Sequence, residues 1–489
     1  MKNRNPGRLL AKILLASVVL ANTAVRAESV DYFTDNGFGN PLSTIHHPSG
    51  EHFKDTTYIA YQGPHEDAYV CAYNHATKKW SGPVLAGVSP MGKTPDPVDN
   101  NEVDSHGKPA MMVDNQGYIH LIFGAHGGNP LLGRNNFGTP AGFGHGGKLT
   151  HLVSKNPEDI SAWKVLDNIS PFGTYPQFVQ MEDGGIYLFY RHGSHQSDWV
   201  YQESSDDGRT FSSPVSVLKH KLQAKGVLHD SWYAWFAKGR GDTITASYIY
   251  HPCSYPGHTK ARLNVYYMKM NCADGSWENV AGEKLTMPVT KEYADQETLI
   301  FKSGDKRCNH GTCRVDQEGH PHVLFRYGAG QARYTRWTGS AWTEPVAVIS
   351  DGSYGGQDGD MIVDSLTNVR MVLMRNIDGR NEVGWWNTTD GGKTWAKETP
   401  LLSRPGGGFE IGALIENFTP EGMVVVSEGR VPEHLYRKMY LLGKDGPVQR
   451  PAEEASHIQK QLEILKKSGA KPTPKTDRAA KKANKGDDE

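Results

Sequence analysis

A turn of one kind occurs twice in this chain and decides the fold. Residues 204–211 read Ser-Ser-Asp-Asp-Gly-Arg-Thr-Phe, and residues 388–395 read Thr-Thr-Asp-Gly-Gly-Lys-Thr-Trp. In both turns, Asp and Ser or Thr side chains can bind the turn amides, a glycine can take a positive φ, and the last aromatic ring can pack between sheets. Both turns stand at the end of a third strand of a repeated unit, so they predict a protein built of repeated β-sheets.

The repeated unit extends outward from these turns along most of the chain. It has a strand, a polar turn with Gly or Asp, a second strand rich in Tyr, Phe, Val and Ile, and a third strand that ends near Trp. This pattern is typical of propeller blades. A less regular unit around Thr57–Gln62 opens the series. The clearest strand pairs are Pro109–Asp114 with Tyr118–Ala125, Tyr175–Met181 with Ile186–Arg191, Ser231–Lys238 with Thr243–His251, Gly311–Asp316 with His322–Tyr327, Asp360–Asp364 with Val369–Arg375, and Phe409–Glu416 with Gly422–Glu428.

These units predict an all-β fold, a seven-bladed β-propeller over residues 28–448, with a short C-terminal helix and a disordered tail. The two quoted turns resemble the Asp box of sialidase-type propellers, which is a structural feature and usually lies away from the substrate. Composition agrees, because Gly 54, Pro 28, Trp 11 and Tyr 22 describe a chain full of turns and aromatic strands.

The N-terminal segment, residues 1–27, has the pattern of a secretory signal peptide. Basic residues precede an apolar run from Ile13 to Ala21, and Val25-Arg26-Ala27 offers a small-residue cleavage site. The run is interrupted too early to cross a membrane, which takes roughly 20 apolar residues. We therefore expect a secreted protein, periplasmic or extracellular, with no membrane span.

The C-terminal segment, residues 449–489, differs from the propeller repeats. Residues Pro451–Lys467 predict one amphipathic helix, and the Lys-, Ala- and Pro-rich stretch that follows predicts a disordered tail. The net charge of -1 gives no general attraction to polyanions and excludes a nucleic-acid footprint. Five cysteines are too few for a disulfide scaffold, and an odd number cannot all pair with one another. The sequence predicts no particular oligomeric state.

One face of the predicted propeller gathers His, Tyr and Arg side chains. Innermost strands start and second strands end on the same face, so residues at these positions converge on one mouth. A single strand-end His is more often structural, but repetition around the ring favours a functional site. A glycine-rich segment between His126 and Lys148 is longer than a hairpin requires, and it could wall a groove and present His145.

The residues at this mouth resemble those of a known family, the ulvan lyases of the seven-bladed propeller type. The resemblance covers roughly Ser29 to Lys444, and it implies an enzyme that cleaves a sulfated rhamnose–uronate polymer of green algae. It rests on His126 in Gly-Ala-His-Gly-Gly, His145 in the glycine-rich segment, Tyr175 in Gly-Thr-Tyr-Pro-Gln, Arg191 in Tyr-Arg-His-Gly, Tyr233 in Ser-Trp-Tyr-Ala-Trp, and His251 in Tyr-Ile-Tyr-His-Pro.

The implied reaction is a β-elimination that leaves a 4,5-unsaturated uronate end and needs no organic cofactor. Removal of the C5 proton requires a group that neutralises the carboxylate, and Arg191 suits that role because it is permanently charged and can bind in bidentate fashion. His126 is the first choice for the base. Tyr175 would protonate the leaving oxygen, unless Arg191 lowers its pKa enough for it to act as the base.

The remaining residues of the set, His145, Tyr233 and His251, would bind the sugar or share the charge of the carboxylate. The sequence does not order the acid and base roles among His126, His145 and Tyr175.

A second group of residues could bind a metal beside the mouth. Cys253 and His258 follow one second strand, while Cys308 and Cys313 flank the start of the next blade. Ligands at these neighbouring places could close a structural zinc site whose ligands all come from the protein. A Cys308–Cys313 disulfide is the alternative in an oxidising compartment.

Two other functions stay open at this level. A sialidase also uses Asp boxes, arginines and a tyrosine, but the sequence has no Arg-Ile-Pro motif in its first blade, and the mouth histidines have no task in that mechanism. A non-catalytic carbohydrate-binding propeller would keep aromatic and Arg contacts, and it would not need both His and Tyr beside the carboxylate.

Overall fold

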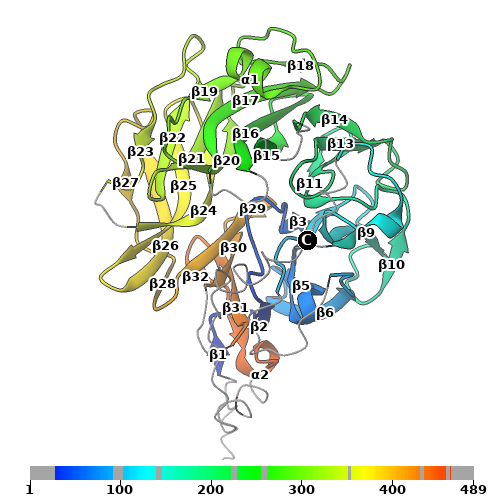
Figure 1. The fold of residues 1–489 in the computed structure, drawn as a ribbon. Coiled ribbons are helices and arrows are strands. Elements are labelled where there is room, and N and C mark those ends of the chain that lie inside the picture. Colours follow the sequence, from blue (N-terminus) through cyan, green and yellow to red (C-terminus); the bar gives the residue numbers. More distant parts are fainter. Residues whose placement is uncertain are drawn as a thin grey trace, which may run out of the picture.

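The computed structural model describes residues 28–91, 103–138, 146–221, 228–254, 261–350, 354–429, 434–458 and 463. These residues form seven blades set in a ring about a central axis (Figure 1). Five blades are separate sheets of four or five strands, and the other two are joined in one nine-stranded sheet by a single parallel bridge between Glu51 and Glu416. The predicted seven-bladed propeller is confirmed.

The blades follow one another along the chain, and each runs from an inner strand to an outer one. Blade one has β3 (Gly50–Phe53), β4 (Thr56–Gln62), β5 (Ala68–Asn74) and β6 (Lys79–Gly87). Blade two has β7 (Ala110–Val113), β8 (Ile119–His126), β9 (Gly146–Ser154) and β10 (Trp163–Leu166). Blade three has β11 (Thr174–Gln180), β12 (Ile186–Arg191), β13 (Trp199–Ser204) and β14 (Val215–Leu218). Blade four has β15 (Leu228–Lys238), β16 (Thr243–Ser254), β17 (Leu263–Asn271), β18 (Trp277–Glu278), the helix α1 (Lys291–Glu297) and β19 (Leu299–Phe301).

The second half of the ring repeats the plan. Blade five has β20 (Cys308–Val315), β21 (Pro321–Tyr327), β22 (Gln331–Arg336) and β23 (Val346–Ala347). Blade six has β24 (Tyr354–Val363), β25 (Val369–Ile377), β26 (Arg380–Thr388), β27 (Ala396–Lys397) and β28 (Leu402–Pro405). Blade seven has β29 (Phe409–Thr419), β30 (Gly422–Glu428), β31 (Tyr436–Gly443) and β32 (Gly446–Pro447).

An N-terminal strand closes the ring. Strand β2 (Thr34–Phe38) pairs antiparallel with β31, so blade seven takes its outer strand from the other end of the chain. Next to it, β1 (Ser29–Val30) pairs with β33 (Arg450–Pro451). Because the two ends of the chain share one blade, the ring cannot open without breaking a sheet.

The two turns that predicted the fold have a structural role. Asp206 accepts hydrogen bonds from Thr210 and Ser204, and Asp390 accepts the matching bonds from Thr394 and Thr388. In the second turn, Gly392 has a φ of +91°, and a Cβ atom there would lie 2.4 Å from the Tyr334 ring. No larger residue fits that position.

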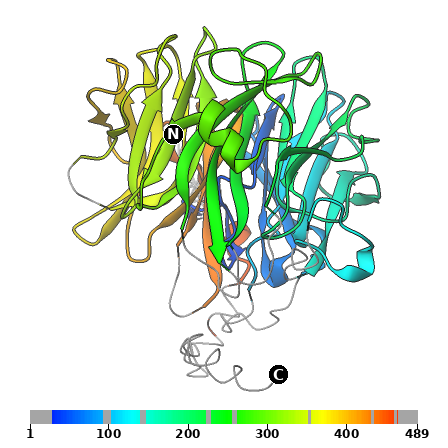
Figure 2. The same cartoon turned by 45° about the horizontal axis from the view of Figure 1, so that its top comes forward.

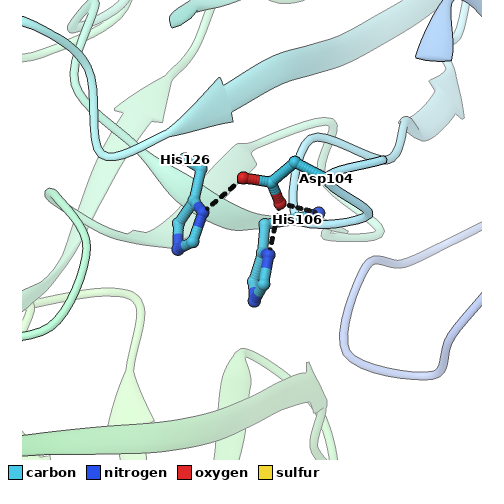
Figure 3. Close-up of side chains that lie close together, drawn as sticks. All are labelled: Asp104, His106 and His126. Carbon is cyan, nitrogen blue, oxygen red and sulfur yellow. Dashed lines mark hydrogen bonds and ion pairs between the residues drawn. The ribbon is translucent and has the colours of Figure 1, made fainter. Parts of the chain in front are cut away.

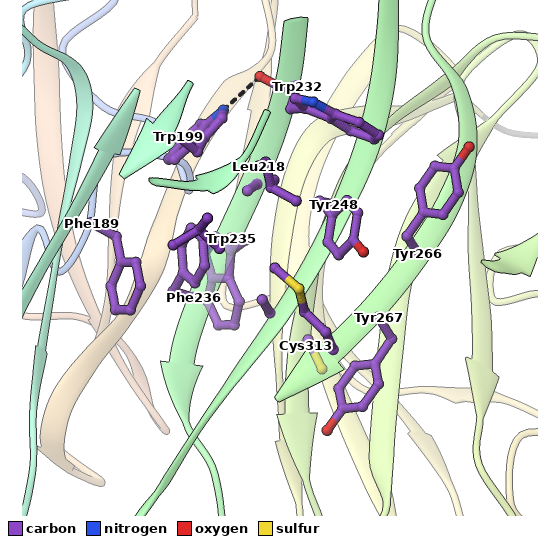
Figure 4. Close-up of a cluster of buried hydrophobic side chains, with 14 of the residues drawn as sticks. Phe189, Trp199, Leu218, Trp232, Trp235, Phe236, Tyr248, Tyr266, Tyr267 and Cys313 are labelled. Atoms are coloured by element: carbon purple, nitrogen blue, oxygen red, sulfur yellow. Dashed lines mark hydrogen bonds between the residues drawn. The ribbon is translucent and has the colours of Figure 1, made fainter. Parts of the chain in front are cut away.

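A large aromatic core lies between blades three and four and includes Tyr175 and Tyr233. Figure 4 shows Trp199, Trp232 and Trp235 packed with Phe189 and Phe236 in this cluster. The Trp199 indole donates a 2.7 Å hydrogen bond to the backbone carbonyl of Trp232, which joins the two blades. Fully buried rings of this size make the frame around the mouth rigid.

The C-terminal helix is shorter than predicted. Helix α2 covers only Ala452–Ala455, and the chain leaves the helix at Ser456, so one continuous helix over Pro451–Lys467 is wrong. Asp35 explains the break, because its carboxylate accepts hydrogen bonds from the backbone amides of His457 (2.7 Å) and Ile458 (3.2 Å). Of the tail beyond, the described part contains only Glu463.

Strands of every blade run through the depth of the ring, so each blade presents strand ends on both faces (Figure 2). Residues at the ends of neighbouring strands therefore meet at one face. Within the described parts of the chain, no helix is long and apolar enough to cross a membrane.

Candidate active site

The predicted site residues meet at the mouth of the propeller, between blades two, three and four. His126 ends β8, Tyr175 is the second residue of β11, and Arg191 ends β12. Tyr233 lies in β15. The guanidinium carbon of Arg191 lies 4.9 Å from the centre of the Tyr175 ring and 5.4 Å from the centre of the Tyr233 ring. Four residues from three blades thus form one cluster.

A hydrogen-bonded triad stands at the blade-two side of this cluster (Figure 3). The carboxylate of Asp104 binds His126 Nδ1 through Oδ2 at 2.7 Å, and it binds His106 Nδ1 through Oδ1. The two imidazole rings stack with centroids 3.8 Å apart. The His106 ring also lies 5.7 Å from the Tyr175 ring. The triad therefore continues the cluster around Arg191.

The charge on Asp104 fixes the tautomer of both histidines. Burial raises the pKa of Asp104, but hydrogen bonds from His106 and His126 outweigh it and hold the pKa well below its usual range. An ionised carboxylate only accepts, so both Nδ1 atoms carry the proton, and Nε2 is the basic nitrogen of each neutral ring. Burial lowers the pKa of His106. The triad can therefore supply a neutral, oriented imidazole.

The same three residues are the group in the described chain whose ligand atoms are close enough to hold a metal ion, all within 4.8 Å of one another. Two ligands of one tetrahedral zinc lie roughly 3.3 Å apart, given bonds of about 2.0–2.1 Å. The 2.7 Å separation of His126 Nδ1 and Asp104 Oδ2 is a hydrogen-bond length instead. A metal bound through His126 Nδ1 and Asp104 Oδ2 would require this hydrogen bond to break.

Tyr175 is held in an unusual backbone conformation. Its φ is +59°, which is rare for a residue other than glycine and is typical of functional sites. The pairing of β11 with β12 shifts register between Thr174 and Gln177, so a bulge re-aims the tyrosine toward the mouth. Its ring stacks on Trp199 at 6.4 Å and meets the His46 ring edge-on at 5.1 Å.

His46 in turn connects Tyr175 to the triad segment. Its Nε2 donates a 2.8 Å hydrogen bond to the backbone carbonyl of His106, which can only accept. Its Nδ1 is therefore left to accept a 2.8 Å hydrogen bond from the Ser43 hydroxyl. This chain of contacts fixes the position of the loop that carries His106.

Arg191 is completely buried and has unused donors. Its Nη1 donates a 3.2 Å hydrogen bond to the Ser231 hydroxyl, whereas Nε and Nη2 have no partner among the described residues. A buried guanidinium without a counter-charge is costly unless an anion binds it. The arrangement predicts that a carboxylate or similar anion binds at this point.

The two tyrosines beside Arg191 have opposite proton affinities. Burial and the neighbouring Tyr233 raise the pKa of Tyr175 well above its usual value. Burial also raises the pKa of Tyr233, but the positive charges of Arg262 and Arg191 outweigh it and lower the pKa overall. Arg262 donates a 3.0 Å hydrogen bond to the Tyr233 hydroxyl, and its guanidinium carbon lies 4.4 Å from the ring centre. Tyr175 is thus the proton donor of the pair.

The remaining predicted sugar-binding residues have mixed outcomes. His251 pairs with Ser231 across β15 and β16, and its ring lies 5.5 Å from that of Tyr233, so it belongs to the cluster. His145 lies outside the described residues. Sequence reasoning missed Asp104, His106 and Arg262. All three precede a strand. Only their residue type and their nearness to a predicted strand end could have marked them as site residues.

The predicted zinc site with four ligands is wrong, because Cys308 and Cys313 lie too far apart in β20 to bind one ion. His258 and the side chain of Cys253 lie outside the described residues. Cys308 and Cys313 are buried free thiols, and burial raises the pKa of each to about 12. They pair with Tyr327 and Val323 of β21, which are four residues apart in that strand, so about 13 Å separates Cys308 from Cys313. The structure therefore holds no disulfide between these two cysteines.

Comparison with known sequences gives a consistent family. The model of the BNR repeat-containing family matches residues 56–348. An ulvan lyase of Alteromonas sp. (strain LOR) is 44% identical over 437 residues, covering 86% of this chain and 88% of the relative. An ulvan lyase of Nonlabens ulvanivorans is 42% identical over 473 residues, covering 91% of this chain and 98% of the relative.

Comparison with solved structures agrees. The structure of a PL25 ulvan lyase superposes with a TM-score of 0.82 at 42% identity, covering 87% of this chain and 98% of that one. A second PL25 ulvan lyase structure, which is bound to -[GlcA(1-4)Rha3S]-, has a TM-score of 0.82 at 41% identity. It covers 87% of this chain and 98% of that one.

Proposed function

This chain belongs to the ulvan lyases, and we propose that it cleaves the uronate linkages of ulvan by β-elimination at the mouth between blades two, three and four. The observation that carries the proposal is the buried Arg191, whose Nε and Nη2 lack partners in the described chain and which lies against two tyrosine rings. A uronate carboxylate supplies the anion that this guanidinium needs.

The elimination begins at the acidified C5 position of the uronate. Binding of the carboxylate to Arg191 neutralises its charge and stabilises the enolate that develops when C5 loses its proton. We assign the proton to Nε2 of His126, because Asp104 holds the proton of that ring on Nδ1. The electron pair of the C5–H bond then forms the C4=C5 double bond, and the C4–O4 bond breaks.

The leaving O4 atom must take up a proton as it departs. Tyr175 suits this role because its raised pKa keeps the phenol protonated across the neutral range. Its strained backbone and its stacking on Trp199 hold the hydroxyl in one place. Tyr175 and His126 both lie beside the His106 ring, so the acid and the base can serve one sugar ring.

A hydrolase of the sialidase type is a poorer fit to this geometry. Such an enzyme uses tyrosine as the nucleophile, which requires a group that helps it lose its proton. The raised pKa of Tyr175 works against that step, and no Asp or Glu in the described chain is hydrogen-bonded to its hydroxyl. Two histidines oriented by one carboxylate have a task in proton abstraction instead.

Further features of the proposal come from the sequence alone. Residues 1–27 would direct export, which suits a substrate too large to enter a cell. Binding of a polyanion by a chain of net charge -1 would depend on the local positive charge at the mouth.

The proposal is tested by following the reaction product. Purified protein incubated with ulvan should generate the ultraviolet absorbance of a 4,5-unsaturated uronate, and Arg191→Gln should reduce its rate by about a hundredfold or more. Reducing sugar released without that absorbance would indicate hydrolysis and contradict the proposal.

A further inference from the structure

Two arginines at the mouth have no carboxylate as a counter-charge among the described residues. Among the described residues, neither Arg191 nor Arg262 forms an ion pair with Asp or Glu, and each has a buried Nε without a hydrogen-bond partner. Arg314 and Arg375 show the contrast, because Arg314 pairs with Asp360 at 2.7 Å and Arg375 pairs with Glu382 at 3.1 Å. The site is therefore built with two positive charges that the described chain leaves unneutralised.

Both guanidinium groups lie beside the Tyr233 side chain. Their central carbons lie 5.4 Å and 4.4 Å from the centre of the Tyr233 ring, and Arg262 donates to the Tyr233 hydroxyl at 3.0 Å. The backbone carbonyl of Arg262 accepts a 2.7 Å hydrogen bond from the amide of Cys308, which ties this arginine to blade five. Each arginine is thus fixed by a different part of the ring.

The reaction proposed above changes the charge of the bound sugar. A uronate carries one negative charge in the ground state. Loss of the C5 proton to a neutral base leaves an enolate whose two negative charges spread over C5 and the carboxylate oxygens, until the C4–O4 bond breaks and O4 leaves with the proton of Tyr175. One guanidinium matches the ground state, whereas two match the intermediate. A charge complement of this kind stabilises the transition state more than the substrate.

We propose that Arg262 is a second catalytic arginine, which binds the carboxylate side of the enolate together with Arg191 and contributes chiefly when the second negative charge develops. The inference rests on the proposed β-elimination and adds a residue to it. Arg191 is the residue that binds the substrate carboxylate in the ground state. Arg262, shared between Tyr233 and the developing anion, makes its larger contribution to the turnover number.

The test compares turnover and affinity in three variants. Arg262→Gln should lower kcat on ulvan by about a hundredfold. In a Tyr175→Phe background, which blocks turnover, the same change should alter the Kd for ulvan oligosaccharides by less than about threefold. Arg262→Lys keeps the charge without the bidentate geometry and should recover about tenfold of the lost kcat. The matched control is Arg240→Gln, which changes an exposed arginine beyond the other end of β15. This variant should have the kcat and Kd of the wild type.

A further measurement separates catalysis from positioning of Tyr233. If Arg262 acts only by holding that hydroxyl, Arg262→Gln has no added effect in a Tyr233→Phe background, and the proposal is overturned. The proposal requires a further loss of at least about tenfold there. An unchanged kcat in Arg262→Gln, or a loss confined to KM, also overturns it. Failure of the wild-type protein to form any unsaturated uronate would instead refute the β-elimination itself.

Discussion

Replacing Asp104 with Asn should disable the proposed base while leaving the propeller folded. The carboxylate accepts from Nδ1 of both His126 and His106, and its side chain is 14% exposed. An amide of the same shape can accept from only one of the rings and presents N–H to the other, so one histidine must move its proton to Nε2. A ring with Nε2 protonated cannot accept the C5 proton. We expect kcat to fall by about a hundredfold or more.

The cost to stability should be smaller than the cost to catalysis. One hydrogen bond to a charged acceptor is lost, which is worth about 1.5–3 kcal/mol. Steady-state assays of unsaturated uronate formation, with thermal unfolding measured on the same samples, check both numbers. The control is Asp167→Asn, whose side chain is 86% exposed and pairs with Lys148, and which should retain full activity. Asp104→Asn protein with more than a third of wild-type kcat would refute the assigned role of the triad.

Two other predictions follow from the described residues. Tyr175→Phe should lower kcat more than about a hundredfold with little change in oligosaccharide affinity, measured by kinetics and calorimetry, and full activity would contradict the acid role. Burial raises the pKa of Glu51 to about 8. Between its ordinary pKa of 4.5 and pH 8, the folded state therefore holds a proton that the unfolded chain has released. The free energy of unfolding should fall as the pH rises toward 8. Glu51→Gln should therefore stabilise the protein by on the order of a few kcal/mol at pH 9 and hardly at pH 4, and an equal shift of the melting temperature at both pH values would contradict this.

The fold could be predicted from the sequence because its signals are local. The Asp-box turns, the alternating apolar strands and the spacing of the units each lie within a few residues of one another. The helix prediction for Pro451–Lys467 was wrong at Ser456 because the group that ends the helix, the Asp35 carboxylate, is more than four hundred residues away in sequence. Amphipathic periodicity carries no information about such a contact.

The site could be predicted only in part. The residues that were predicted differ from those that were missed for a physical reason. His126, Tyr175, Arg191 and Tyr233 belong to strands, whose ends the propeller geometry brings to one face. Asp104 and His106 belong to the loop before β7, and Arg262 precedes β17. The position of loop residues depends on tertiary contacts, such as the hydrogen bond from His46 to the carbonyl of His106, which no pattern in the sequence reveals.

The most direct test of the central claim is the product of ulvan cleavage. Mass spectrometry of oligosaccharides released by the wild-type protein, combined with ultraviolet absorbance, distinguishes elimination from hydrolysis because hydrolysis adds one water molecule to each cleaved bond. We predict products that carry a 4,5-unsaturated uronate at the new non-reducing end and lack the added water. Saturated, hydrated products would contradict the account.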